Sequence, residues 1–191
     1  MIKGDNMRMI RLLGLSGSLR SNSTHDLILR TIAEELCPQN SPLIVHGLSD
    51  IPLYNEDLDG ESTKAPEPVR RFRQAVLEAD GVVIGSPEYN HGMSGVLKNA
   101  LDWLSRPHGK SVLKGKPVLT FTASPAFTGG VRAQQQLNET LWAIPAELVR
   151  YPQIVIGSVG TKIEQGRLVD TAARQFLENG LLELRAAILR V

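Results

Sequence analysis

Hydroxyl groups, glycines and an arginine follow the first apolar run of the sequence. The stretch from Met9 to Thr24 reads MIRLLGLSGSLRSNST, and Gly14 and Gly17 lie where its apolar part ends. Glycines permit a tight turn, hydroxyls donate hydrogen bonds, and a guanidinium group suits phosphate oxygens. These groups could therefore bind an anion, and the candidate ligands are Ser16, Ser18, Arg20, Ser21, Ser23 and Thr24.

The same stretch predicts a strand, an anion-binding loop and the start of a helix. The first turn of a helix has unpaired N–H groups and a partial positive charge, so a phosphate binds there by geometry and by field. The spacing G-x-G-x-x-G and a Gly-Lys-Ser/Thr triplet are both absent, which argues against a nucleoside triphosphate. The alternative is an ordinary turn between strand and helix, in which Ser23 or Thr24 only caps the helix. This stretch alone leaves both interpretations open.

A second loop, from Ser86 to Gly95, has the composition of a wall for a planar heterocycle. Tyr89 offers apolar contact, Gly92 permits close approach, and the backbone N–H groups between Glu88 and Gly92 can bind ring oxygens and nitrogens. Glu88 and His91 are the residues here that suit acid–base work, but a lone histidine more often just faces solvent. A third loop, 124–130, could wall the other side of a ring or be a plain turn.

The elements that must position these loops alternate between strand and helix. This alternation predicts right-handed crossovers and a parallel sheet with helices on both faces. The expected fold is α/β, a flavodoxin-like three-layer sandwich with a five-stranded parallel sheet of order 2-1-3-4-5. The three loops then meet outside the carboxyl ends of strands one, three and four. The strands are expected at 9–16, 42–46, 81–86, 116–124 and 153–156, and the helices at 27–36, 68–78, 95–104, 131–142 and 170–191.

Composition limits the class of protein. The 191 residues suffice for one domain, and 21 basic against 20 acidic side chains give a net charge of +1, which does not favour nucleic acid or a membrane surface. No stretch approaches the roughly 18 consecutive apolar residues of a membrane helix. The single cysteine, Cys37, cannot form an internal disulfide and is read as a buried or incidental thiol. We expect a frayed extension at 1–7, one flavodoxin-like domain at 8–191, and a cytoplasmic location.

Several motifs give the chain a family resemblance. It resembles the NADPH-dependent FMN reductase family, in particular its chromate reductase and quinone reductase branch. The middle motif, Pro87 to Asn90 followed by Gly95 to Trp103, is specific, and agreement spans nearly the whole chain. The matching residues are Gly17-Ser-Leu-Arg20 with Ser23, Pro87-Glu-Tyr-Asn90, Gly95 to Trp103, Ala123-Ser-Pro125, Gly129-Gly130 and Arg132-Ala-Gln134.

The resemblance implies FMN as cofactor and assigns residues to it. The FMN phosphate would bind Ser16, Ser18, Arg20, Ser23 and Thr24. The isoalloxazine would be lined by Pro87, Glu88, Tyr89, Asn90, His91 and Gly92, and closed by Ser124 and Gly129. His25 stands where the family often has Asn, and its ring is a further candidate donor to the phosphate. Helix 95–104 is read as core-facing, with Asn99 and Asp102 bracing the flavin loop or a subunit interface.

The implied reaction passes hydride from NADPH or NADH through FMN to quinones, with chromate, azo compounds or free flavin as further acceptors. The cofactor supplies the chemistry, so no catalytic side chain and no metal are expected. The resemblance also implies a homodimer or homotetramer. A preference for NADPH would need a cation near its ribose 2′-phosphate. The sequence does not choose among the candidates, which are Arg20, Arg106, His108, Lys110 and Arg132.

Two other classes compete with this interpretation. A flavodoxin-type electron carrier would lack its own nicotinamide site, but such carriers are usually strongly acidic and carry a different phosphate loop. A flavin-free regulatory or scaffold protein on the same fold is the other class, because fold does not imply function. Retention of yellow FMN during purification would exclude the scaffold.

Overall fold

The fold was analysed in a computed structural model, which describes residues 8–59 and 65–190. The extension expected at 1–7 lies outside these residues. The sheet is parallel, with the order β2-β1-β3-β6-β7 and with β8 also paired to β6. Its strands are β1 (Leu12–Ser16), β2 (Leu43–His46), β3 (Gly81–Ser86), β6 (Pro117–Ala123), β7 (Glu147–Leu148) and β8 (Ile154–Ile156).

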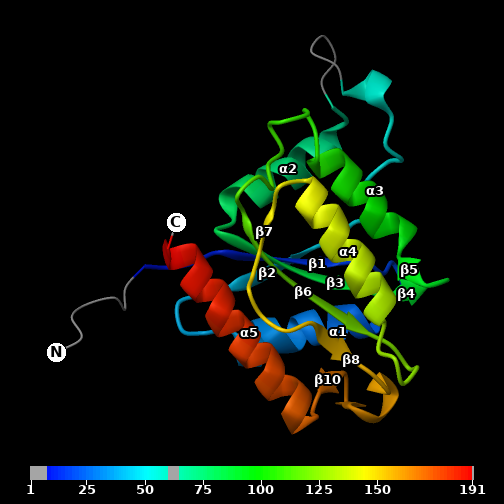
Figure 1. Ribbon diagram of the computed structural model, residues 1–191, viewed down its shortest axis with the longest axis vertical. Coiled ribbons are helices and arrows are strands. Elements are labelled where there is room, and N and C mark those ends of the chain that lie inside the picture. Colours follow the sequence, from blue (N-terminus) through cyan, green and yellow to red (C-terminus); the bar gives the residue numbers. More distant parts are fainter. Residues whose placement is uncertain (1–7, 60–64, 191) are drawn as a thin grey trace.

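Two layers of helices cover the sheet (Figure 1). The buried side chains of one face come from α1, the π-helical turn η1 and α5, and those of the other from α2, α3 and α4. These layers confirm the expected three-layer flavodoxin-like sandwich. The helices are α1 (Thr24–Thr31), η1 (Ile32–Leu36), α2 (Glu67–Glu78), α3 (Gly95–Leu104), α4 (Val131–Ala143) and α5 (Thr171–Arg190).

The central strands follow from their composition. Every residue of β1, β3 and β6 is buried, as expected of parallel strands with helices on both faces. Along β6, Leu119 and Phe121 face α1 and α5, whereas Val118 faces the other layer. Because successive side chains of a strand point to opposite faces of the sheet, β6 contributes to the core on both faces.

The fifth position of the sheet differs in detail from the expected single strand. It is divided into β7, which pairs with the start of β6, and β8, which pairs with its end. The Val149 N–H still donates to the Val118 carbonyl of β6 over 3.0 Å. Residues 150–153 then leave the pairing, and Pro152 has no N–H to donate to a ladder. The division explains why the sequence indicates this strand only weakly.

Short elements complete the chain. They are η2 (Glu56–Leu58), β4 (Glu88–Tyr89), β5 (Gly92–Met93), η3 (Val159–Thr161), β9 (Ile163–Glu164) and β10 (Arg167–Leu168). The β9–β10 hairpin attaches to α1, because the Leu168 N–H donates to the Thr31 hydroxyl over 3.1 Å. No helix in the described part of the chain is both long and apolar enough to cross a bilayer.

Candidate functional site

The first loop joins β1 to α1 at the carboxyl edge of the sheet. Ser16 ends the strand, and the Gly17 N–H donates to the Gly85 carbonyl of β3 over 2.8 Å. Ser23 is the N-cap of α1, and its hydroxyl oxygen accepts from the Asp26 N–H over 3.1 Å. A capping oxygen keeps its own proton free to donate. Capping and anion binding are therefore compatible at Ser23.

A pocket of about 460 Å³ adjoins this loop. Serine hydroxyls and the exposed Arg20 line it on the loop side, and the segment after β2 forms the opposite wall. Asp26 and Arg30 of α1 line it on the helix side, whereas Ser23 and Thr24 are not among its lining residues. Hydroxyls and guanidinium groups are donors that a phosphate monoester needs, so Ser16, Ser18, Arg20 and Arg30 fit the phosphate of FMN, with the Asp26 carboxylate beside them.

The second loop is a β-hairpin. Strands β4 and β5 pair antiparallel, and Asn90 and His91 at its tip have φ values of +49° and +66°. Two consecutive left-handed residues make a type I′ turn, which matches the twist of a hairpin. The hairpin lies beside the start of α4 (Figure 1), and the Met93 N–H donates to the Gln136 side chain over 2.8 Å. Its tip is exposed, and Tyr89 is 51% exposed.

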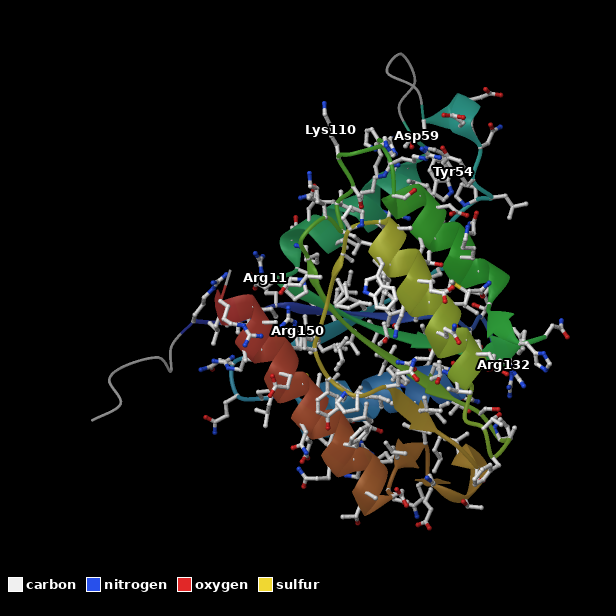
Figure 2. All side chains as sticks on the ribbon, viewed as in Figure 1. Arg11, Tyr54, Asp59, Lys110, Arg132 and Arg150 are labelled. Carbon is white, nitrogen blue, oxygen red and sulfur yellow. The ribbon has the colours of Figure 1, made fainter. Side chains whose placement is uncertain are left out.

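Glu88 holds this hairpin to α4. One carboxylate oxygen accepts from the N–H groups of Arg132 at 3.0 Å and Ala133 at 3.1 Å, in the first turn of the helix. Figure 2 shows Arg132 at this end of α4. An anion at a helix N-terminus is stabilised by the unpaired N–H groups and the helix dipole. Glu88 thus acts as a helix cap, and its carboxylate is already engaged.

Glu88→Ala is expected to lower the free energy of unfolding by about 1–2 kcal/mol, because two N–H groups lose their acceptor. Urea denaturation measures this change. The matched control is Glu139→Ala on the same helix, where the exposed carboxylate accepts from Gln135. Equal losses in the two variants would contradict the capping role of Glu88.

The third loop begins at the end of β6 and leads into α4. The Ser124 N–H donates to the Ile156 carbonyl over 3.1 Å. The Ser124 hydroxyl oxygen accepts from the Ala126 N–H, also over 3.1 Å. Gly129 and Gly130 have φ values of +64° and +94°, which glycine adopts at little cost. The two glycines therefore place the start of α4 next to the sheet edge.

Hydrogen bonds join the loops to one another. The buried Ser94 hydroxyl donates to the Gly17 carbonyl, and its oxygen caps α3 by accepting from the Leu97 N–H. Sequence reasoning missed Ser94 as a link, although a serine directly before the predicted helix 95–104 is a signal for an N-cap. It also missed Gln136, which lies on an expected helix without a motif.

His25 lies under these loops rather than in the pocket. Its ring is 3% exposed, the Nε2 atom accepts from the Ala123 N–H over 3.3 Å, and the ring stacks on Phe121 at 5.8 Å. Burial lowers the pKa of His25 from 6.5 to about 4, although a hydrogen bond to the Ser86 backbone and the Asp26 carboxylate both raise it. The ring is neutral and buried, and its Nε2 atom already accepts from Ala123, so His25 does not supply the extra phosphate donor considered above.

The structure thus brings the three predicted loops to one edge. The parallel register aligns Ser16 with Gly85, Ser86 with Thr122, and Ala123 with Ile156, so the strands end side by side. Cys37 is outside this group. Burial raises the pKa of its thiol to about 11, which argues against a nucleophilic role.

Comparisons with known proteins agree with this geometry. The sequence profile of the NADPH-dependent FMN reductase family matches residues 10–180. The chain is 38% identical to an NAD(P)H-dependent FMN reductase of Pseudomonas aeruginosa, over 95% of this chain and 97% of that protein. It is 36% identical to an NADPH:quinone oxidoreductase of Arabidopsis thaliana, over 96% and 94% of the two chains.

A solved structure is similar in fold. The flavoenzyme NAD(P)H:(acceptor) oxidoreductase FerB from Paracoccus denitrificans superposes with a TM-score of 0.77 and 28% identity. The alignment covers 95% of this chain and 98% of that one.

Proposed function

The chain belongs to the NADPH-dependent FMN reductase family, and we propose that it is an FMN-dependent oxidoreductase that passes hydride from NADPH or NADH to quinones. The observation that carries the proposal is the meeting of three loops at one sheet edge. One loop has the donors of a phosphate site, and the other two leave neighbouring strands at the same edge of the sheet. Relatives named quinone reductase support the class of acceptor.

We assign the phosphate to the first loop, with Ser16, Ser18, Arg20, Ser23 and Thr24 as its donors. The hairpin residues Pro87 to Gly92 would line one side of the isoalloxazine. Ser124 and Gly129 would close the other side. The left-handed tip of the hairpin and the exposed Tyr89 support this assignment, because they leave backbone N–H groups and an aromatic face open to a planar ligand.

Bound FMN supplies the two-electron chemistry, so the task of the protein is to hold and orient the cofactor. Donors fixed before the cofactor arrives stabilise developing negative charge without reorganisation. The capping contacts of Ser23 and Glu88 fix the loops in this way. The engaged Glu88 carboxylate also leaves the site without a free carboxylic acid at that position.

The test is anaerobic reduction. The purified protein is expected to be yellow, to bleach on addition of NADPH or NADH, and to recover its colour when a quinone is added. A yellow protein that bleaches with neither nicotinamide would instead be a flavodoxin-type carrier. A colourless protein that cannot be loaded with FMN would contradict the assignment of the loops. Chromate, azo compounds and free flavin belong in the same assay as further acceptors.

Arg20→Ala is expected to weaken FMN binding about 10- to 100-fold, because a hydrogen bond between charged groups contributes about 1.5–3 kcal/mol. Quenching of flavin fluorescence measures the dissociation constant. The matched control is Arg150→Ala, which removes the same charge at a site far from the hairpin end of α4 (Figure 2). If both variants weakened binding equally, the effect would come from net charge and not from a phosphate contact.

Preference for NADPH would need a cation near the ribose 2′-phosphate. Of the candidates considered, Arg132 lies beside the hairpin, whereas Lys110 lies far from that end (Figure 2). This placement favours Arg132 over Lys110.

We also propose that residues 8–191 form one FMN-binding domain, located in the cytoplasm and assembled as a homodimer or homotetramer. Helices on both faces of one sheet support the single domain. The family resemblance supports the homodimer or homotetramer. Light scattering of the purified protein would measure the assembly directly.

A further inference from the structure

We infer that His25 is a positioning residue that fixes the distance between the phosphate loop and the two loops that face the flavin ring. The inference rests on the proposed function, because it concerns the placement of FMN. His25 is suited to this role by its position in the chain. It is the second residue of α1, so its backbone moves with the phosphate loop, while its ring points into the protein.

The ring reaches two different strand ends. Nε2 accepts from the N–H of Ala123, the last residue of β6, directly before Ser124. The ring also interacts with the backbone of Ser86, the last residue of β3, directly before Pro87. A neutral imidazole offers one donor and one acceptor, and Nε2 is the acceptor here. One side chain therefore connects all three loops.

The ring has little freedom to shift. It stacks on the Phe121 ring with an interplanar angle of 25°. Phe121 in turn fills the space beside Gly85, where an added Cβ would lie 2.4 Å from its ring. Movement of the imidazole would require movement of Phe121 against β3. The spacing of the loops is thus set by rigid contacts within the core.

FMN carries a phosphate at one end and the isoalloxazine ring at the other. In the proposed site the phosphate binds the first loop and the ring binds the other two loops. Its phosphate and its ring can bind together only if the spacing of their sites matches the ligand, and then the second contact forms at a high effective concentration. Riboflavin lacks the phosphate and does not depend on that spacing. The ratio of the riboflavin to the FMN dissociation constant therefore measures how well the loops are held in register.

The test compares His25→Phe with Thr31→Val. Phenylalanine keeps an aromatic ring against Phe121 but removes both hydrogen bonds. Thr31→Val also removes a buried hydrogen bond from α1, but at the end that contacts Leu168 and not the site. Both variants lose stability, and His25→Phe alone changes the link between the loops. His25→Gln, whose amide has a donor and an acceptor, is the conservative variant.

Fluorescence titrations at pH 8 give both dissociation constants for each protein, with circular dichroism confirming the fold. In His25→Phe we expect the riboflavin-to-FMN ratio to fall about tenfold, which corresponds to the net contribution of about one hydrogen bond lost from the simultaneous fit. Riboflavin affinity is expected to change by less than about threefold. Thr31→Val should leave the ratio unchanged, and His25→Gln should restore most of it.

An unchanged ratio in His25→Phe, with a loss of stability like that of Thr31→Val, would show a structural role only and overturn the inference. Wild-type protein that binds neither flavin would instead overturn the proposed function. The ¹⁵N chemical shifts of His25 in the wild-type protein give a test that needs no variant. The proton is expected on Nδ1, and a ring protonated on Nε2 would also overturn the inference, because the Ala123 N–H would have no acceptor.

Discussion

Gly157→Ala is expected to lower the free energy of unfolding by about 3 kcal/mol, the upper part of the range for overpacking, because the added atom meets backbone. Gly157 directly follows β8, and an added Cβ would lie 2.2 Å from the Phe127 carbonyl oxygen and 3.0 Å from its carbon. The obstacle is backbone, so a change of rotamer cannot relieve the clash. Either β8 or the third loop must move.

The control for this prediction is Gly160→Ala. No atom lies within 4 Å of a Cβ at Gly160, and its φ is outside the left-handed region, so its stability should stay within about 0.5 kcal/mol of wild type. Urea denaturation of both variants gives the comparison. Because the clash displaces the loop that contains Ser124 and Gly129, we also expect Gly157→Ala to bind FMN more weakly. A Gly157→Ala protein as stable as wild type would show that the loop is free to move.

The free energy of unfolding is expected to fall by about 3 kcal/mol between pH 6.5 and pH 4 through His25 alone. Burial lowers the pKa of His25 in the folded protein to about 4, whereas the ordinary value of 6.5 applies to the unfolded chain. In this interval the unfolded chain takes up a proton that the folded protein does not. The contribution of His25 to stability is thus complete above about pH 6.5 and is lost as the pH falls towards 4.

Urea denaturation at constant ionic strength from pH 4 to pH 7.5 measures this loss. Other groups titrate in the same interval, so the wild-type curve is compared with that of His25→Gln, which cannot take up the proton. The difference between the two curves isolates His25. Parallel curves would mean that the imidazole is accessible to protons in the folded state.

The sheet could be predicted because its signal is strong in the sequence. A parallel strand with helices on both faces needs apolar residues in succession, and Gly81 to Ile84 and Val118 to Phe121 provide them. The position of the first loop could be predicted because its glycines and serines lie between an apolar run and a helical pattern, but the same residues are also typical of an ordinary capped turn. The position of the candidate site followed from the fold, since ligands of such sheets bind outside the carboxyl ends.

The contacts that hold the loops together could not be predicted. Glu88 is predicted to line the flavin, and no role is predicted for Ser94. Their contacts join loops that are distant in sequence, and such hydrogen bonds leave no local pattern. His25 is predicted as a further phosphate donor and not as a buried residue, because burial of a single polar side chain depends on neighbours that come from other strands. β7 was missed because two residues are too few to show a period.

The divided fifth position of the sheet has a consequence for aggregation. An exposed edge strand presents a row of unpaired N–H and C=O groups on which another molecule can add a strand. Here that row is cut into the two residues of β7 and the three of β8, separated by a segment that carries Arg150 and Pro152. The opposite edge, β2, has four residues. Neither edge offers a long template, and we expect the concentrated protein to resist growth into β-sheet fibres.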